Sequence, residues 1–177
     1  MGIKSKTKRL DVNYTPLQIS GSIEVVGSVP DRQIYSGDVK EYTPDYTLTP
    51  LVLFPRCNAT DPDSYIQSGC VNASLTNMKW YQIVGTQRTL INSDNTDYEI
   101  TTEGDDKGQI KVKRNSSVSV PLAFEFYAEY VDTRTSQVYM FRMSTVIAVS
   151  DATLPAPILK LDSPATVAWN PLRNPLI

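Results

Sequence analysis

Three stretches decide the fold: Met78-Lys79-Trp80-Tyr81-Gln82, Pro121-Leu-Ala-Phe-Glu-Phe-Tyr-Ala-Glu-Tyr130 and Gln137-Val-Tyr-Met-Phe-Arg-Met143. In each, large apolar side chains alternate with polar ones, which is the pattern of a β-strand with one buried face. The short polar segment Asp132–Ser136 joins the second stretch to the third, so these two are predicted to pair as an antiparallel hairpin. We therefore expect an all-β protein, built as an antiparallel sandwich with very little helix.

Earlier parts of the chain predict further strands. Residues Leu17–Val26 alternate, and Gly21 in the middle predicts a bulge or a close approach of another segment to the backbone. Residues Tyr46–Phe54 are also predicted to form a strand, which Pro50 would place at a sheet edge or bend because proline cannot donate a ladder hydrogen bond. Residues Pro55–Thr76 are predicted to form a long loop.

The composition fits one cored domain with extensions. The chain has 177 residues, of which 41% are hydrophobic, and a formal net charge of −2, values typical of a globular protein. We divide it into an N-terminal arm with one strand (1–31), a β-sandwich (32–150) and a proline-rich C-terminal arm (151–177). Residues 1–9 are basic with no apolar stretch behind them, so we expect no export signal.

The residue types exclude several kinds of chemistry. The chain contains no histidine, which removes Ser–His–Asp and Cys–His catalysis and every histidine-ligated metal site. Asp61 and Asp63, or Asn92, Asp94 and Asp97, could offer oxygen atoms to Ca²⁺, but neither spacing matches an EF-hand loop. We therefore predict a protein that is not an enzyme and has no cofactor or metal site.

Two other sets of residues remain as candidate sites. Cys57 and Cys70 could form a disulfide across a short polar loop in an oxidising compartment, or remain two reduced thiols. Tyr35, Tyr42 and Tyr65 lie in segments predicted to be loops, and together they could form a platform on which a sugar ring stacks. The alternative for these tyrosines is packing at the rim of the sandwich.

From about Tyr46 to Val149 the chain resembles immunoglobulin-like and fibronectin-III-like domains. The resemblance lies in Lys79-Trp80-Tyr81-Gln82, in the Phe124–Tyr130 strand and in the strand that follows it. It implies that Trp80 fills the core, as the tryptophan of the third strand does in such domains. Antibody domains differ because they place core cysteines before this tryptophan and on the later strand. As a whole the chain is similar to virion components of bacteriophages and prophages.

This resemblance implies a non-enzymatic structural or assembly module in a phage or prophage virion, as a tail, fibre or head-decoration component. Its partners would be protein subunits, either copies of itself or other virion proteins, which the arms 1–31 and 151–177 would bind by adding a strand to a sheet edge. It would be made in the host cytoplasm and located in the virion. The alternative is an adhesion or carbohydrate-binding module on a bacterial cell surface, with a glycan as ligand. We expect neither a nucleic acid nor a membrane as partner.

Overall fold

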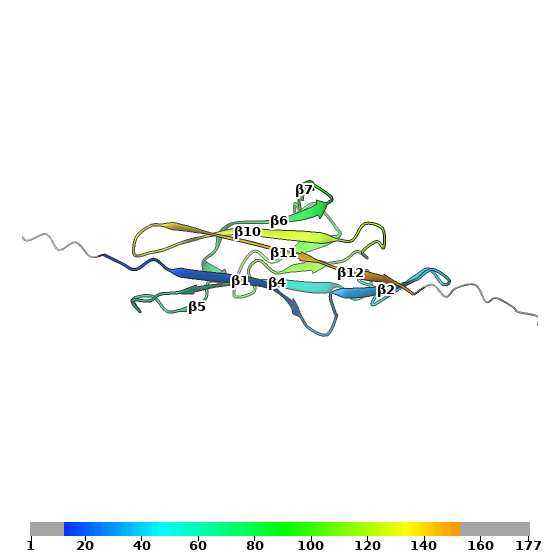
Figure 1. The fold of residues 1–177 in the computed structure, drawn as a ribbon, viewed down its shortest axis with the longest axis horizontal. Coiled ribbons are helices and arrows are strands. Elements are labelled where there is room, and N and C mark those ends of the chain that lie inside the picture. The colour runs from blue at the N-terminus through cyan, green and yellow to red at the C-terminus, as the bar shows by residue number, and fades with distance from the viewer. Residues whose placement is uncertain (1–12, 153–177) are drawn as a thin grey trace, which may run out of the picture.

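The computed structural model describes residues 13–152 and consists of two antiparallel sheets packed face to face, with a small third sheet at one end (Figure 1). The predicted all-β antiparallel sandwich is confirmed. The first sheet has the order β1-β4-β9-β8, with β5 paired to β4, and the second has the order β11-β10-β6-β7. The third has the order β12-β2-β3, in which β12 and β2 run parallel.

The strands have the following bounds. The first sheet contains β1 (Gln18–Val26), β4 (Leu51–Thr60), β5 (Gly69–Cys70), β8 (Tyr98–Ile100) and β9 (Ile110–Val112). The second contains β6 (Thr76–Val84), β7 (Gln87–Leu90), β10 (Ala123–Val131) and β11 (Val138–Val146). The third contains β2 (Arg32–Ser36), β3 (Glu41–Thr43) and β12 (Ala148–Asp151), and a single 3₁₀ turn, η1, spans Asn72–Ser74.

The hairpin formed by β10 and β11 is confirmed with the predicted faces. The two strands pair antiparallel over their full length, with Ala128 opposite Phe141. Every second residue of β10 from Phe124 to Tyr130 is buried, and Phe141 is buried on β11. The alternation of apolar and polar residues in the sequence therefore predicts correctly which face of this hairpin is buried in the core.

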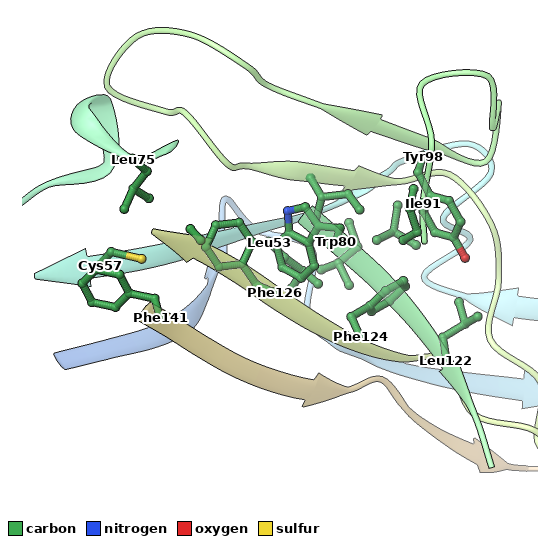
Figure 2. Close-up of a cluster of buried hydrophobic side chains, with 14 of the residues drawn as sticks. Leu53, Cys57, Leu75, Trp80, Ile91, Tyr98, Leu122, Phe124, Phe126 and Phe141 are labelled. Carbon is green, nitrogen blue, oxygen red and sulfur yellow. The ribbon is translucent and has the colours of Figure 1, made fainter. Parts of the chain in front are cut away.

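Trp80 lies at the centre of the core between the two sheets, as predicted (Figure 2). Its side chain is 1% exposed, and its ring packs against Phe126 at a centroid distance of 5.1 Å and edge-on against Phe124 at 6.4 Å. The indole Nε1–H donates a hydrogen bond to the carbonyl of Gly108 at 2.7 Å. The polar atom of this large apolar side chain is thus satisfied inside the core, as a buried indole requires.

Gly21 confirms the predicted close approach. A Cβ atom at this position would lie 2.5 Å from the Sδ atom of Met143, so the backbone of β1 lies directly against a side chain of β11. The β1 strand, which we assigned to the N-terminal arm, pairs with β4 along all of its nine residues. It is therefore an edge strand of the first sheet and closes one side of the sandwich against β11.

The β4 strand is longer and more central than the sequence predicts. We expected Tyr46–Phe54 to be a strand that lies at a sheet edge or bends at Pro50, with a loop over Pro55–Thr76. Instead, β4 begins after Pro50 and continues to Thr60 between β1 and β9. Both the edge position and the beginning of the loop were wrong.

Pro55 is tolerated in this central strand because Asn72 replaces a strand partner there. Pro55 pairs with Ile23 of β1 on one side, whereas on the other side β9 faces only Leu51–Leu53. In the gap, the Asn72 side chain donates from Nδ2 to the Pro55 carbonyl at 2.7 Å and accepts the Cys57 N–H at its Oδ1 at 2.9 Å. Because the N and C=O of one strand residue point to the same side, the N–H that Pro55 lacks would have pointed into this gap.

Gly108 offers a test of how the core is built. Its φ of +94° is unfavourable for a residue with a Cβ, and that Cβ would lie 3.1 Å from Pro55 and 3.3 Å from Phe126. We expect Gly108→Ala to lower the free energy of unfolding by roughly 2 to 4 kcal/mol, since backbone strain and overpacking add. The measurement is urea unfolding followed by far-UV circular dichroism.

Gly104→Ala is the matched control for this prediction. Gly104 has a φ of +78° but open space where its Cβ would stand, so only the backbone term applies, and we expect a loss of about 1 kcal/mol. Equal losses in the two variants would contradict the close packing around Gly108.

Candidate functional site

A groove of about 840 Å³ lies on the side of the sandwich away from β1 and β11. We call it the β6–β8 groove because it lies between the beginning of β6 and the edge strand β8. Its lining consists of three segments and two single residues: Met78–Trp80, Leu90–Thr96, Tyr98–Ile100, Thr102 and Lys113.

The floor of the β6–β8 groove is part of the core. Trp80, Ile91 and Tyr98 are almost fully buried and lie side by side in Figure 2. Ile91 donates its backbone N–H to the Trp80 carbonyl at 2.9 Å, and the Tyr98 ring packs edge-on against Phe124 at a centroid distance of 5.6 Å. The floor is therefore held in place by the same contacts that hold the two sheets together.

The walls add apolar surface that remains accessible. Met78 and Ile100 pack against the core but are only partly buried, and Leu90 is 43% exposed. Three apolar side chains thus border one concavity whose floor is also apolar. Such a surface favours an apolar segment over a small charged substrate.

Two strand edges border the groove. The β7 strand pairs only with Tyr81–Val84 of β6, so in the described part of the chain Thr76–Lys79 of β6 has a strand partner only on its β10 side. On the opposite wall, β8 has β9 as its one strand neighbour within residues 13–152. Edges of this kind present backbone N–H and C=O groups that can bind an extended segment.

The charged rim is largely neutralised within the protein. Glu99 binds Lys111 at 2.6 Å and Lys113 at 2.7 Å, and the hydrogen bond from Lys111, followed by that from Lys113, lowers the pKa of Glu99 to about 2. The carboxylate therefore stays ionised and paired across the ordinary pH range. Its exposed ion pairs contribute little to stability, and the two lysines exceed the one carboxylate, so this point of the rim is slightly positive.

The predicted tyrosine platform is formed only in part. Tyr35 and Tyr42 lie on β2 and β3, not in loops, directly opposite each other in the register, with ring centroids 4.8 Å apart. Tyr65 lies in the loop between β4 and β5 and packs edge-on against Tyr14 at 5.4 Å. Because β5 and β2 lie at opposite ends of the molecule in Figure 1, the three rings do not form one surface.

Both cysteines are free thiols in the structure. Cys57 is buried in the core, and burial raises the pKa of its thiol to about 12. Cys70 is exposed and pairs in the register with Asn58, the residue after Cys57. Its Sγ lies 3.1 Å from the Oδ1 of Asn72, so Asn72 lies between the two cysteine-bearing segments.

The acidic residues Asp61 and Asp63 bind an arginine. Together with Asp132 they surround the guanidinium of Arg134, whose side chain is 4% exposed. Arg134 NH1 bonds to Asp61, and its NH2 lies 2.9 Å from Asp132 Oδ2. No group of three histidine, cysteine, aspartate or glutamate side chains that could hold a metal ion occurs in the described residues.

This cluster also holds the N-terminal segment. The Thr15 N–H and hydroxyl donate to the Asp63 carboxylate at 2.6 and 2.8 Å, and Arg134 NH2 donates to the Thr15 carbonyl at 3.0 Å. Two residues further on, the Leu17 N–H donates to the Tyr139 hydroxyl at 2.9 Å. We call this set of contacts the Arg134 clamp; it fixes where the chain enters β1.

Comparison of the chain with models of protein families finds no match, and comparison with curated proteins finds none either. Within residues 13–152, no helix has the length and apolar character needed to cross a membrane. The basic residues Lys4, Lys6, Lys8 and Arg9 lie outside the described residues.

The Arg134 clamp predicts how stability depends on pH. The Arg134 hydrogen bond lowers the pKa of Asp132; burial acts to raise the pKa of Asp61, but N–H donors from Ile66, Asp63 and Tyr65 and the charge of Arg134 outweigh it. Since both folded-state pKa values lie below the ordinary 3.8, these carboxylates stabilise the fold above that pH. Their contribution is lost as the pH falls through the folded-state values.

We therefore expect the melting temperature to fall as the pH drops below about 4. Arg134→Gln should lower it at neutral pH and reduce the further loss in acid, because the carboxylates then remain buried without their cation. Arg114→Gln is the control, since Arg114 forms an exposed pair with Asp97. If Arg134→Gln and Arg114→Gln gave the same pH profile by circular dichroism, the clamp would have no stabilising role.

Proposed function

We propose that this protein is a non-enzymatic structural module that assembles with other protein subunits. The observation that carries the proposal is the β6–β8 groove, a concavity with an apolar floor that is bordered by two strand edges. A surface of this kind suits an extended protein segment, because backbone hydrogen bonds provide affinity and the concavity accepts alternate side chains.

The path of the chain supports the same proposal. Figure 1 shows the described chain beginning at one end of the long axis, before β1, and finishing at the opposite end, after β12. The entry is fixed by the Arg134 clamp and the exit by the pairing of β12 with β2. The two ends of the described part therefore lie at opposite ends of the sandwich, as suits a module that connects to neighbours at both ends.

The strand order supports the immunoglobulin-like assignment. In chain order, and setting aside β2, β3, β5 and β12, the strands match A, B, C, C′, D, E, F and G of such domains. The two sheets then have the orders A-B-E-D and G-F-C-C′, which are the orders of immunoglobulin sheets. Trp80 takes the position of the strand-C tryptophan. We propose that the protein functions in the virion of a bacteriophage or prophage, because the chain as a whole is similar to virion components of these viruses.

The assembly proposal is tested by the mass of the purified full-length protein in solution. Between about 1 and about 100 µM we expect the weight-average mass from light scattering to rise above the monomer mass of 19.7 kDa. Small interfaces between subunits commonly dissociate in this range of concentration. A monomer at every concentration would remove self-assembly. The virion setting is tested separately, by mass spectrometry of particles purified from the strain that encodes the chain.

A second candidate function, glycan binding, is favoured by the pair of neighbouring rings of Tyr35 and Tyr42, which are tilted by 43° to each other at the end opposite the clamp. If these rings bind a sugar, Tyr42→Ala should reduce binding on a glycan array by about tenfold or more, because ring stacking supplies most of the contact area. Tyr65→Ala is the matched control, since Tyr65 lies elsewhere. No binding to any glycan, or an equal loss in both variants, would reject this function.

A further inference from the structure

The geometry points to a particular occupant of the β6–β8 groove: residues 165–170 of a second copy of this chain, Ala-Thr-Val-Ala-Trp-Asn, bound in an extended conformation. This inference rests on the proposed assembly function and makes it specific, because it names the partner, the segment and the surface. It is argued from the shape of the groove, the sequence after the described residues and the direction in which the chain leaves the sandwich.

The groove needs an apolar partner with side chains spaced as in a strand. Its partly exposed apolar side chains are Met78, Leu90 and Ile100, and they lie above a floor formed by the buried rings of Trp80 and Tyr98. The beginning of β6 and the β8 strand offer backbone groups along both walls. An extended segment can pair with one of these edges while every second side chain enters the concavity.

The sequence after Ala152 contains one segment that meets these needs best. Proline has no N–H, so a segment that pairs with a strand edge lies between prolines. Residues 158–163 and 165–170 both qualify, and the first of these carries Lys160 and Asp162. Residues 165–170 carry no charge, and in extended form Val167 and Trp169 point to the same side. Tryptophan is also the residue type most enriched among those that dominate binding energy.

The direction of the chain selects a second copy over the same molecule. After β12 the described chain ends at the tip of the long axis, at Ala152 (Figure 1). Pro155 and Pro157 follow, and prolines favour an extended backbone over a reversal. Extended chain from Ala152 to residue 165 spans at most about 45 Å, which suffices to reach a neighbouring sandwich placed beyond this tip.

The resulting contact is heterologous. The described chain ends at one end of the molecule, whereas the groove lies on its side. Each copy would therefore bind one neighbour through its residues 165–170 and a second neighbour through its β6–β8 groove. Repeated contacts of this kind form rings if the rotation closes and filaments if it does not.

The experiment uses full-length variants that lack one surface each. Trp169→Ala removes the anchor of the donor segment, and Leu90→Asp places a charge in the acceptor groove. The control is Val84→Asp: Val84 is 45% exposed, close to the 43% of Leu90, and lies outside the groove lining. Circular dichroism first establishes that each variant is folded, and sedimentation velocity then measures its self-association.

We expect Trp169→Ala and Leu90→Asp each to weaken self-association about thirtyfold or more, as truncation of a dominant anchor does, and Val84→Asp to leave it within about threefold of the unaltered chain. An equimolar mixture of the first two variants retains one intact donor and one intact groove. We therefore expect the mixture to form a one-to-one dimer that neither variant forms alone.

Three results would overturn the inference. The first is that Trp169→Ala or Leu90→Asp self-associates as strongly as the unaltered chain. In that case the protein would still assemble, but through another surface. The second is the absence of the dimer from the mixture of two folded, monomeric variants, which would exclude donor and groove as partners. The third is a monomeric unaltered chain at all concentrations, which would remove the proposed self-assembly together with this inference.

Discussion

The structure depends on one hydrogen bond, from the indole of Trp80 on β6 to the carbonyl of Gly108 just before β9. It joins the two sheets at the centre of the core, where an indole N–H without a partner would carry the full cost of burying a polar group. The bond needs the backbone at residue 108 to lie close to the rings of Trp80 and Phe126, and the absence of a Cβ allows that approach. The turn that contains Gly108 and the strand that contains Trp80 are thus fixed by one contact.

That contact also explains why a groove exists beside it. The Trp80 ring fills the space between the sheets at the level where β7 ends, and Ile91 bonds to the Trp80 carbonyl as the chain crosses from one sheet to the other. Beyond this crossing no strand continues the second sheet on the side of Met78 in the part of the chain that the structure describes. The core is therefore sealed at Trp80, while its rim stays open along the β6–β8 groove.

Much of the fold follows from the sequence, because alternation records burial directly. Phe124 and Phe126, the hairpin with β11 and the core position of Trp80 are predicted correctly, since each depends on local pattern. The position of the β4 strand is predicted wrongly, because a proline such as Pro55 is rare in a central strand. Only the three-dimensional structure brings the Asn72 amide to the gap beside Pro55. The groove is missed as well, because the exposure of a strand edge depends on where β7 ends relative to β6, and no local pattern in the sequence records that. Tyr65 is separated from Tyr35 and Tyr42 because the elements that carry them lie at opposite ends of the sandwich.

The two sides of the sandwich differ in how they treat exposed strand edges, and this difference bears on assembly. On one side, β1 lies against β11 through the contact of Gly21 with Met143, and the Arg134 clamp fixes the chain where β1 begins. This contact is packing between sheets and not pairing: within residues 13–152 the strand partner of β1 is β4 and that of β11 is β10. On the other side, the edges of β6 and β8 are short and border a concavity. A segment that bound there would have to pair with the backbone and also fit the groove, which is a stricter requirement than pairing with a flat edge.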